Sequence, residues 1–379
     1  MTSDSRPDNA PTALVRIAPL LRGLLAQPTG NEDFPHAPVL LACRADPKAT
    51  AAEADAVNLE ALGPLDDDSF RDRLAAAVQK CAAGHHGKPC RFVLPKVGTL
   101  TVTSAADPEG HLPMRNRVAL VTGSAGAIGY AVCRKLLESG CHLVVTDLPG
   151  ERLDRLAGDL GSAAAGRVLK VPMDVTDRAS IAAALATVAA AWGGIDIVVH
   201  NAGIAHVSTL AEMDLEVFRR LERVNVDGTL LVLAEAGDLL TRQATGGDIV
   251  IMSTKNVPSP SAGFGAYSAT KAACHQLGRI ASLELAPKGI RVNMVAPDAV
   301  FSEGEYRSGL WDEVGANRMK ARGLDEEGLH EYYRSRNLLK ARVTGRHVAN
   351  AVYFFISRQT PTTGATIPVD GGLPDATPR

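Results

Sequence analysis

Two short segments of this chain carry residues whose types and spacing could do chemistry. Tyr267 and Lys271 lie four residues apart, so a helix would place a phenol and an ammonium on one face. A phenol can give a proton to a substrate oxygen or take one back, and a nearby positive charge favours the phenolate. Residues 122–129, Thr-Gly-Ser-Ala-Gly-Ala-Ile-Gly, form a glycine-rich turn of the kind that binds a dinucleotide pyrophosphate at a helix start. Together, the two segments predict hydride transfer to or from a nicotinamide.

The turn and the residue that ends the following strand predict how a dinucleotide is held. Close approach of the backbone to phosphate favours glycine, and the residues expected to bind the cofactor here are Gly123, Ser124, Gly126, Ile128 and Gly129. Asp147 closes the next strand, where a carboxylate accepts hydrogen bonds from the adenosine ribose and repels a 2′-phosphate. The alternative role of Asp147 is to cap the turn at residues 148–150. We therefore expect NAD(H), with NADP(H) as the alternative if Arg152 or Arg155 reaches the phosphate.

Proton transfer also needs a hydroxyl group that points at the substrate oxygen. Ser253 and Thr254 follow directly after the apolar segment 248–252, and both carry such a group. Because this segment is expected to be a strand of the same sheet, its carboxyl end lies beside the nicotinamide site. Either residue is therefore a candidate for this role.

Near-continuous apolar segments alternate with helical segments along residues 115–379. Apolar segments buried on both faces are typical of a parallel sheet with helices on each side. The expected strands are residues 118–121, 142–146, 167–171, 195–199, 248–252, 290–295 and 365–369. We therefore predict an α/β fold with a doubly wound, Rossmann-type parallel sheet and a small N-terminal α/β appendage. The long polar segment 301–339 interrupts the last strand–helix unit, and we expect it to form a substrate lid.

The residues before this domain divide into three parts. Residues 1–35 are expected to be mostly disordered or irregular, except for an apolar helical patch at 13–25. Residues 36–104 have the pattern of a small α/β region, in which the expected elements are strands at 39–43, 91–94 and 100–103 and a helix at 69–83. Residues 105–114 are rich in turn formers and are expected to be a linker.

The composition excludes several classes of function. The chain has 379 residues, a net charge of −2 and 46% hydrophobic residues, so we expect no binding to nucleic acid or to anionic membranes. No apolar run is long enough to span a bilayer, and the polar N-terminus lacks a signal-peptide core, so a cytoplasmic location is expected. The six scattered cysteines favour reduced thiols. Cys81, His85, His86 and Cys90 do not have a standard zinc-finger spacing, and we predict no bound metal.

Residues 115–373 resemble the short-chain dehydrogenase/reductase family. Beyond the segments above, the matching motifs are Asp174–Val175, Asn201–Ala202–Gly203, Val224–Gly228 around Asn225, and Val369–Gly372. In that family Asn, Ser, Tyr and Lys form the catalytic group, which implies catalytic roles for Asn225, Thr254, Tyr267 and Lys271. The resemblance also implies that Asn225 holds a water that relays protons to Lys271, which in turn holds the nicotinamide ribose. The cofactor contacts implied in the same way are Asp174, Val175, Asn201, Ala202, Gly203, Tyr267, Lys271 and Pro297.

Two departures from the family pattern fall beside the expected reaction site. Thr254 stands thirteen residues before Tyr267, where the family has its catalytic serine, so Ser253 stays a second candidate and an expected substrate contact. The threonine keeps the hydroxyl but adds a methyl group next to it. Asp298 follows Pro297 in place of the usual glycine. This change is expected to bring a polar side chain to the nicotinamide and the substrate.

Two further departures and the lid complete the candidate site. Ala127 replaces a glycine of the turn, and His200 replaces an asparagine. For His200 and the nearby His206 we favour a structural role over contact with the substrate. In the lid, Trp311 is an expected substrate contact. Four more lid side chains either shape a polar pocket or only pack on the domain: Tyr332, Tyr333, Arg334 and Arg336.

Within the family, residues 115–379 resemble the dehydrogenase half of bifunctional rhamnulose-phosphate aldolase/alcohol dehydrogenases. The similarity is carried by the region around Trp311 and by residues 293–301, 338–340 and 368–372. In those proteins a zinc-dependent aldolase domain precedes the reductase, so residues 36–104 can be interpreted as a remnant of that domain. The N-terminal part of this chain has no His-x-His pair of the kind that would hold the zinc, and we expect no aldolase activity.

The sequence thus predicts an NAD(P)-dependent oxidoreductase that interconverts a ketone or aldehyde and an alcohol on a small polyhydroxylated or sugar-derived substrate. By analogy, a keto-sugar of a biosynthetic pathway, such as an aminoglycoside's, is one candidate. The alternatives are a lactaldehyde-type alcohol dehydrogenase and a nucleotide-binding scaffold that partners another enzyme. The family resemblance also implies a homodimer or homotetramer that pairs helices 215–234 and 264–285 across a two-fold axis.

Overall fold

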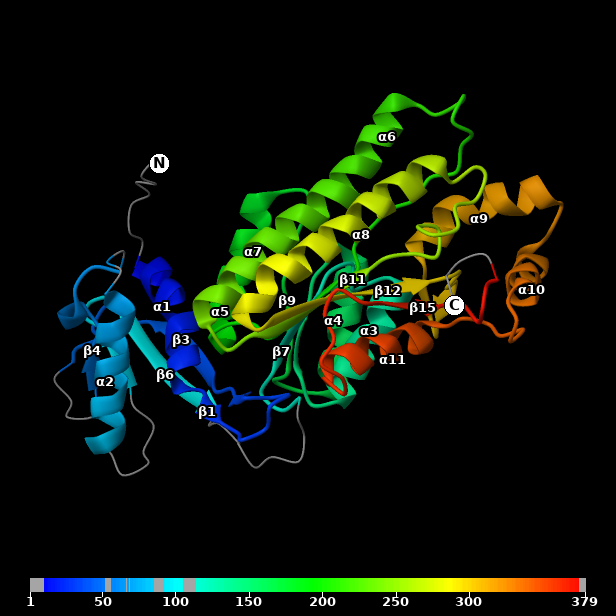
Figure 1. Cartoon of the computed structure of the whole chain (residues 1–379). Helices are drawn as coiled ribbons and strands as arrows, with labels where there is room; N and C mark the ends of the chain where they lie inside the picture. Colours follow the sequence, from blue (N-terminus) through cyan, green and yellow to red (C-terminus); the bar gives the residue numbers. More distant parts are fainter. Residues whose placement is uncertain are drawn as a thin grey trace.

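A seven-stranded parallel sheet forms the centre of the molecule (Figure 1). A computed structural model describes residues 10–51, 56–65, 67, 69–84, 91–104 and 114–374. The strands of the sheet follow the order β15-β12-β11-β10-β7-β8-β9. Their bounds are β7 Val118–Val121, β8 His142–Val145, β9 Val168–Lys170, β10 Ile197–His200, β11 Gly247–Met252, β12 Ile290–Pro297 and β15 Thr366–Val369. The predicted doubly wound α/β fold is confirmed.

Helices cover both faces of this sheet because most of the strand residues are apolar on both sides. One face packs against α3 Ala127–Glu138, α4 Glu151–Ala163 and α11 Gly345–Ile356. The other packs against α5 Arg178–Trp192, α7 Gly228–Gln243 and α8 Gly265–Leu285. The chain leaves β7 towards β8 and β9, and then returns to β10 on the opposite side of β7. Such a reversal opens a crevice at the carboxyl ends of these strands, where open α/β sheets bind their ligands.

The helix expected at residues 215–234 forms three consecutive pieces instead of one. These are α6 Leu215–Leu221, the π-helical turn η2 Glu222–Asp227, and α7 Gly228–Gln243. A π-helical turn adds a residue to the helical ladder and changes which side chains face a neighbour, and such turns often occur at functional sites. Asn225 lies within η2. The apolar pattern could predict the helix, but it carries no signal for this insertion.

A second, smaller unit precedes the sheet. The apolar helical patch expected at 13–25 is helix α1 Ala10–Leu25, which begins earlier than expected and buries Leu14, Ile17 and Leu21 on one of its faces. The four-stranded sheet has the order β3-β6-β5-β4. The elements of this unit are β1 Gln27–Pro28, β2 His36–Ala37, β3 Leu40–Ala45, β4 Ala56–Asn58, η1 Glu60–Leu62, α2 Phe70–Gly84, β5 Arg91–Leu94 and β6 Gly98–Ser104.

Several expectations for the N-terminal part fall on residues outside the described ranges. These are the disorder of residues 1–9, most of the linker at 105–114, and the His85, His86 and Cys90 members of the cysteine and histidine cluster. Cys81 is disulfide-bonded, so the expectation of reduced thiols is wrong for this residue. The free thiols among the described residues are Cys43, Cys133, Cys141 and Cys274.

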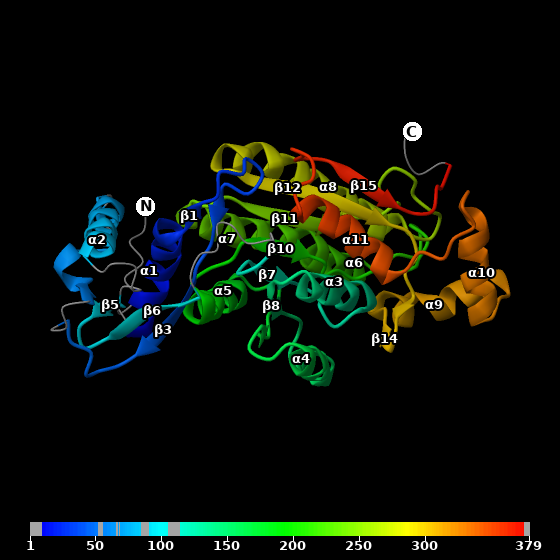
Figure 2. The ribbon, with the colours of Figure 1, turned by 90° about the horizontal axis from the view of Figure 1, so that it is seen from below.

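The small unit and the lid lie at opposite ends of the sheet (Figure 2). Helix α1 packs on α5 and α7 of the large domain, and strand β3 packs on α5. At the other end, residues 301–339 form the short hairpin β13 Ser302–Glu303 and β14 Tyr306–Arg307, followed by α9 Gly309–Arg322 and α10 Glu326–Arg336. The short helix η3 Ala286–Lys288 joins α8 to β12. Within the described part of the chain, every helix is too short or too polar to cross a membrane.

Candidate active site

A cavity of ≈ 1010 Å³ opens at the carboxyl ends of the strands, between the glycine-rich turn and the lid. It brings together most of the side chains that the sequence singled out. The predicted site residues that line it are Gly123, Gly126, Ile128, Asp147, Asp174, Val175, Asn201, Ala202, Gly203, Ser253, Thr254, Tyr267, Lys271, Pro297, Asp298 and Trp311. Ser124, Gly129 and Asn225 are predicted site residues that lie behind the cavity wall.

The turn between β7 and α3 needs glycine for two different reasons. Gly123 has a φ of 60°, and a Cβ atom there would lie 2.9 Å from the Cα atom of Ala202. A Cβ atom on Gly129 would lie 2.3 Å from the carbonyl oxygen of Gly123, so this glycine lets α3 begin close beneath the turn. Gly126 borders the cavity and has no atom within 3.4 Å of the place of a Cβ. The start of α3 therefore presents backbone N–H groups to open space, which fits a pyrophosphate.

Ser124 contributes to this turn from behind. Its hydroxyl donates to the carbonyl oxygen of Thr146 at 3.0 Å, and its side chain is fully buried. Asn201 supports the turn from the other side, since its Nδ2 atom donates to the carbonyl oxygen of Gly123 at 2.8 Å. Thr122 accepts hydrogen bonds from the backbone of Asn201 and Ala202. These contacts hold the turn in place before any cofactor binds.

Asp147 lies on the cavity wall beside the turn. Its Oδ2 atom accepts a hydrogen bond from the backbone N–H of Ala125 at 3.0 Å, and its Oδ1 atom accepts one from Leu148 at 2.9 Å. Each oxygen keeps a lone pair for a ribose hydroxyl. Arg152 lines the same part of the cavity, and its Nη2 atom lies 3.4 Å from the carbonyl oxygen of Ala125. The donor and acceptor set here fits a dinucleotide.

Tyr267, Thr254 and Lys271 line the same cavity, and Thr254 forms a hydrogen bond with Tyr267. Burial raises the pKa of Tyr267 to about 12, while a hydrogen bond with Thr254 acts in the opposite direction. We expected Lys271 to lower this pKa, but the group that acts against burial is the Thr254 hydroxyl, so Tyr267 carries its proton at neutral pH. Burial also lowers the pKa of Lys271, whose Nζ atom donates to the carbonyl oxygen of Met252 at 2.8 Å. The cavity wall thus offers a protonated phenol next to a hydroxyl, and the Lys271 side chain lines the same cavity.

The structure separates the two hydroxyl candidates. Ser253 Oγ lies 2.9 Å from Nδ1 of His275 on α8, so this hydroxyl already has a protein partner. The Thr254 hydroxyl instead accepts a hydrogen bond from the backbone N–H of Asn256 at 3.3 Å. It also forms a hydrogen bond with the side chain of Tyr267. Thr254 is therefore the hydroxyl that the fold places against the phenol.

Asn225 is close to Lys271 but is fully engaged with protein groups. A Cβ atom on Gly203 would lie 3.2 Å from Oδ1 of Asn225 and 3.3 Å from Nζ of Lys271. The Oδ1 atom of Asn225 accepts a hydrogen bond from the backbone N–H of Ile204 at 2.9 Å. Its Nδ2 atom donates to the carbonyl oxygen of Ile204 at 2.9 Å and to the Thr270 hydroxyl at 3.0 Å. The backbone carbonyl oxygen of Asn225 accepts hydrogen bonds from the Thr229 hydroxyl and the Cys274 thiol. The relay role that the resemblance implies for Asn225 stays a prediction.

His200 is buried behind the same strands. Its two ring nitrogens lie 3.1 Å from the Thr122 hydroxyl and 3.0 Å from the Thr229 hydroxyl. Burial and the charge of Lys271 lower the pKa of His200 to about 3, so its ring is neutral at neutral pH. These contacts fit the structural role that was favoured for this residue.

At the lid end of the cavity, Asp298 has a partner that the sequence did not reveal. Arg336 of α10 donates to both of its carboxylate oxygens, at 2.9 and 2.7 Å. The Trp311 ring stacks on Phe301 at 4.3 Å between centroids, and Tyr333 meets both rings edge-on. The lid aromatics thus pack on one another, while Trp311 and Tyr333 also line the cavity.

Four cationic residues on the cavity wall were not predicted, namely Arg220, Arg223, Lys255 and Arg318. Lys255 directly follows Thr254, and this adjacency is the one signal that could have indicated it. Arg318 lies in α9, and nothing in the sequence shows which face of that helix meets the cavity.

Comparisons with known proteins agree with this site. A family model described as short chain dehydrogenase matches residues 117–309. The uncharacterised oxidoreductase YuxG of Bacillus subtilis (strain 168) is 38% identical over 276 residues, which are 72% of this chain and 39% of YuxG. The chain thus spans well under half of that relative's length. Sorbitol dehydrogenase of Cereibacter sphaeroides is 35% identical over 200 residues, which are 53% of this chain and 74% of that enzyme.

A solved structure extends the agreement to the fold. Sorbitol-6-phosphate 2-dehydrogenase SrlD from Erwinia amylovora is similar with a TM-score of 0.62 and 28% identity, and the match covers 67% of this chain and 98% of SrlD. The part matched by the family model contains the glycine-rich turn, Tyr267 and Lys271. Proteins of this kind generally bind NAD(P). The chain is an oxidoreductase that belongs to the short-chain dehydrogenase/reductase family.

Proposed function

We propose that this protein interconverts a ketone or aldehyde and an alcohol on a small polyhydroxylated substrate, with NAD(H) as the preferred cofactor. The observation that carries the proposal is that a single cavity holds Tyr267, Thr254 and Lys271 opposite the glycine-rich turn and Asp147. A bound nicotinamide supplies or accepts the hydride. The residues of this chain then have to bind the cofactor, orient the substrate oxygen and move its proton.

Tyr267 is the proton donor for carbonyl reduction and, as phenolate, the acceptor for alcohol oxidation. Thr254 orients the substrate oxygen through a hydrogen bond. Lys271 holds the nicotinamide ribose and favours the phenolate by its charge. Asn225 acts through its neighbours: its amide ties Ile204 to Thr270 and positions the wall next to Lys271. Gly123, Gly126, Ile128, Asn201, Ala202, Gly203, Asp174, Val175 and Pro297 form the cofactor side of the cavity.

The substrate class is inferred from the cavity wall and from the relatives. The cavity that Tyr267 lines also exposes polar and charged groups of Thr254, Asp298, Arg336 and Lys255. Such groups suit a substrate with several hydroxyls. Two similar proteins are named for sorbitol and sorbitol 6-phosphate. The narrower hypotheses, namely a keto-sugar of a biosynthetic pathway, lactaldehyde, and descent from the dehydrogenase half of an aldolase fusion, stay proposals.

The test is a substrate screen that follows the absorbance of NADH or NADPH. The panel contains polyols, keto-sugars and lactaldehyde, each with both cofactors. Turnover of polyols or keto-sugars that is lost in Tyr267→Phe supports the proposal. Cofactor binding without turnover of any member would instead support the nucleotide-binding scaffold.

A further inference from the structure

The lid end of the cavity carries more positive than negative charge. The cationic residues that line this end are Lys255, Arg318 and Arg336, and the carboxylate that lines it with them is Asp298. Arg336 and Asp298 form an ion pair in which Nη2 of Arg336 donates to both carboxylate oxygens and the carboxylate side chain is 6% exposed, so their charges cancel each other. Lys255 and Arg318 are left as two cations without a carboxylate partner among the described residues.

Arg318 is buried without a full set of partners. Its guanidinium lies over the ring of Phe264, 4.3 Å from the ring centroid, and its Nε atom is a buried donor with no hydrogen-bond partner. The Phe264 ring meets the ring of Tyr267 edge-on at 5.9 Å, so one aromatic ring separates the guanidinium from the proposed proton donor. A buried cation with an unused donor is costly unless something binds it. The cavity is where such a group would enter.

Lys255 is held by neutral partners in the same region. Its Nζ atom donates to Ser261 Oγ at 3.0 Å and lies 3.4 Å from the carbonyl oxygen of Ser259. Burial lowers the pKa of Lys255, and the charges of Arg336 and Arg318 lower it further, while Asp298 and Asp370 act against this shift. Lys255 and Arg318 line the same cavity, and the positive charge of Arg318 acts on Lys255. An anion bound in the cavity would offset both charges.

We propose that Lys255 and Arg318 bind an anionic group of the substrate, either a carboxylate or a phosphate. The substrate class would then be a sugar acid or a sugar phosphate rather than a neutral polyol. Charge-assisted hydrogen bonds from arginine and lysine are suited to both groups. This inference rests on the proposed function, since it assigns the substrate of that same cavity.

The test compares compounds that differ in the anionic group: sorbitol, sorbitol 6-phosphate and gluconate. We expect kcat/KM to be about 10- to 100-fold higher for at least one of the two anions than for sorbitol. Arg318→Gln should remove most of this preference, and Arg318→Lys should restore part of it because it keeps the charge. Arg322→Gln is the matched control, since Arg322 is an exposed arginine of the same helix that stacks on Tyr332. The preference should survive in this control.

The outcomes separate this inference from the proposed function. Faster turnover of sorbitol than of both anions, or an unchanged preference in Arg318→Gln, would overturn the inference and leave the proposed function standing. Failure to bind NADH or NADPH would overturn the proposed function itself. If none of the three compounds is turned over, thermal stabilisation of the NADH complex by 6-phosphogluconate decides. Stabilisation that is lost in Arg318→Gln supports the anion site, and its absence in the wild type contradicts it.

Discussion

Arg22 of helix α1 forms a buried ion pair with Asp196 at the beginning of the central sheet. Arg22 Nη2 lies 2.7 Å from Asp196 Oδ2, and the two side chains are 0% and 3% exposed. The same carboxylate oxygen accepts a hydrogen bond from the backbone N–H of Val118, the first residue of β7. Arg22 also donates to the carbonyl oxygens of Val39 and Asn116. The N-terminal unit is therefore tied to the strand whose other end carries the glycine-rich turn.

Removing one partner of this pair should strongly destabilise the protein. Burial acts to raise the pKa of Asp196, but Arg22 and Arg117 overcome it, so the carboxylate stays charged. In Arg22→Met that charge would be left buried, which costs about 3–5 kcal/mol of unfolding free energy. Denaturant unfolding measures the loss. Arg134→Met, which removes an exposed pair with Glu138, should change stability by less than about 1 kcal/mol. Equal stability of the two variants would contradict this prediction.

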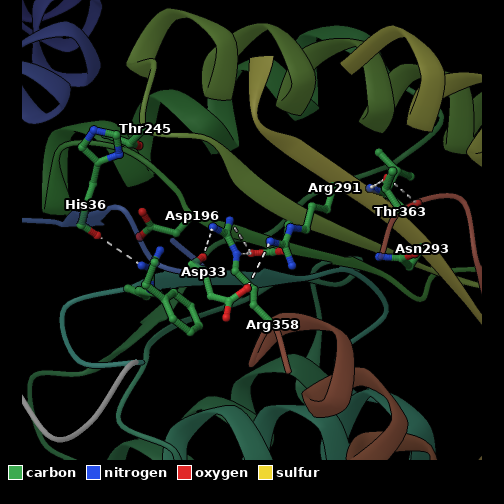
Figure 3. Close-up of polar contacts among 12 residues, drawn as sticks. Asp33, His36, Asp196, Thr245, Arg291, Asn293, Arg358 and Thr363 are labelled. Carbon is green, nitrogen blue, oxygen red and sulfur yellow. Dashed lines mark hydrogen bonds and ion pairs between the residues drawn. The ribbon is translucent and has the colours of Figure 1, made fainter. Parts of the chain in front are cut away.

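A second set of contacts covers the same end of the sheet (Figure 3). Arg358, just after α11, pairs with Asp248 at 2.9 Å and donates to the carbonyl oxygen of Asp33 at 2.8 Å. The guanidinium groups of Arg117 and Arg358 both lie over the ring of Phe34, at 4.7 and 5.3 Å from its centroid. The N-terminal unit and the large domain thus share a polar interface, formed by residues far apart in the chain.

Tyr267→Phe should lower turnover by about 10²–10⁴-fold, the usual contribution of a general acid or base. The substitution removes the phenol proton but keeps the ring against Phe264. NADH binding should persist because the glycine-rich turn is untouched. Steady-state kinetics and fluorescence titration with NADH measure the two effects. Tyr353→Phe, which removes a phenol on α11 outside the cavity lining, is the control. Wild-type turnover in Tyr267→Phe would end the proposed mechanism.

The pH dependence of alcohol oxidation should report the bond between Thr254 and Tyr267. Oxidation needs the phenolate, so its rate rises with pH towards the pKa of Tyr267. Burial raises this pKa to about 12, and the Thr254 hydroxyl lowers it. Thr254→Val removes the lowering contribution, so the pKa should rise and the rising limb of the kcat/KM profile should move to higher pH. Thr254→Ser keeps the hydroxyl and should keep the profile. A shift to lower pH in the valine variant would contradict the assignment.

The sequence predicted the large domain better than the contacts within its site. Strand β7 was predicted with its observed bounds, because Val118–Val121 is a short apolar run between turn signals. The Tyr267 and Lys271 pair and the glycine-rich turn were recognisable because local spacing alone fixes their geometry. Arg318 and the Asp298–Arg336 pair were not, because they depend on how the lid helices sit over the sheet. The Arg22–Asp196 pair was missed for the same reason: periodicity carries no information about a partner far along the chain.

Asp147 should set the preference for NADH over NADPH. The hydrogen bonds from Ala125 and Leu148 hold its carboxylate at the cavity wall, where it would repel a 2′-phosphate. Asp147→Ala should lower the ratio of kcat/KM for NADH to that for NADPH by about tenfold or more, which is about 1.4 kcal/mol. In the double variant that also carries Arg152→Ala, part of the increase in kcat/KM for NADPH should be lost. Asp154→Ala is the control, since this acid of α4 pairs with Lys170 instead. An NADPH preference of the wild type would contradict the assignment.

The exposed face of α6, α7 and α8 should form the contact between subunits. These helices run side by side on one face of the molecule (Figure 1), and Leu215, Leu230, Ile280 and Leu283 are exposed on them. Large apolar side chains gathered on neighbouring helices are typical of an interface. Light scattering should therefore give a dimer or tetramer for the wild type. Leu283→Asp would place a charge in this contact and should shift the protein to a smaller species.

The control for this last substitution is Leu339→Asp, at the end of the lid segment. Leu283 and Leu339 are both 76% exposed, so the two changes remove the same apolar side chain from equally open positions. If the α6–α8 face is the interface, only Leu283→Asp should change the mass measured in solution. A monomeric wild type would contradict the assembly, and dissociation caused by Leu339→Asp alone would place the interface at the lid. NADH binding by both variants shows that the aspartate has not unfolded the domain.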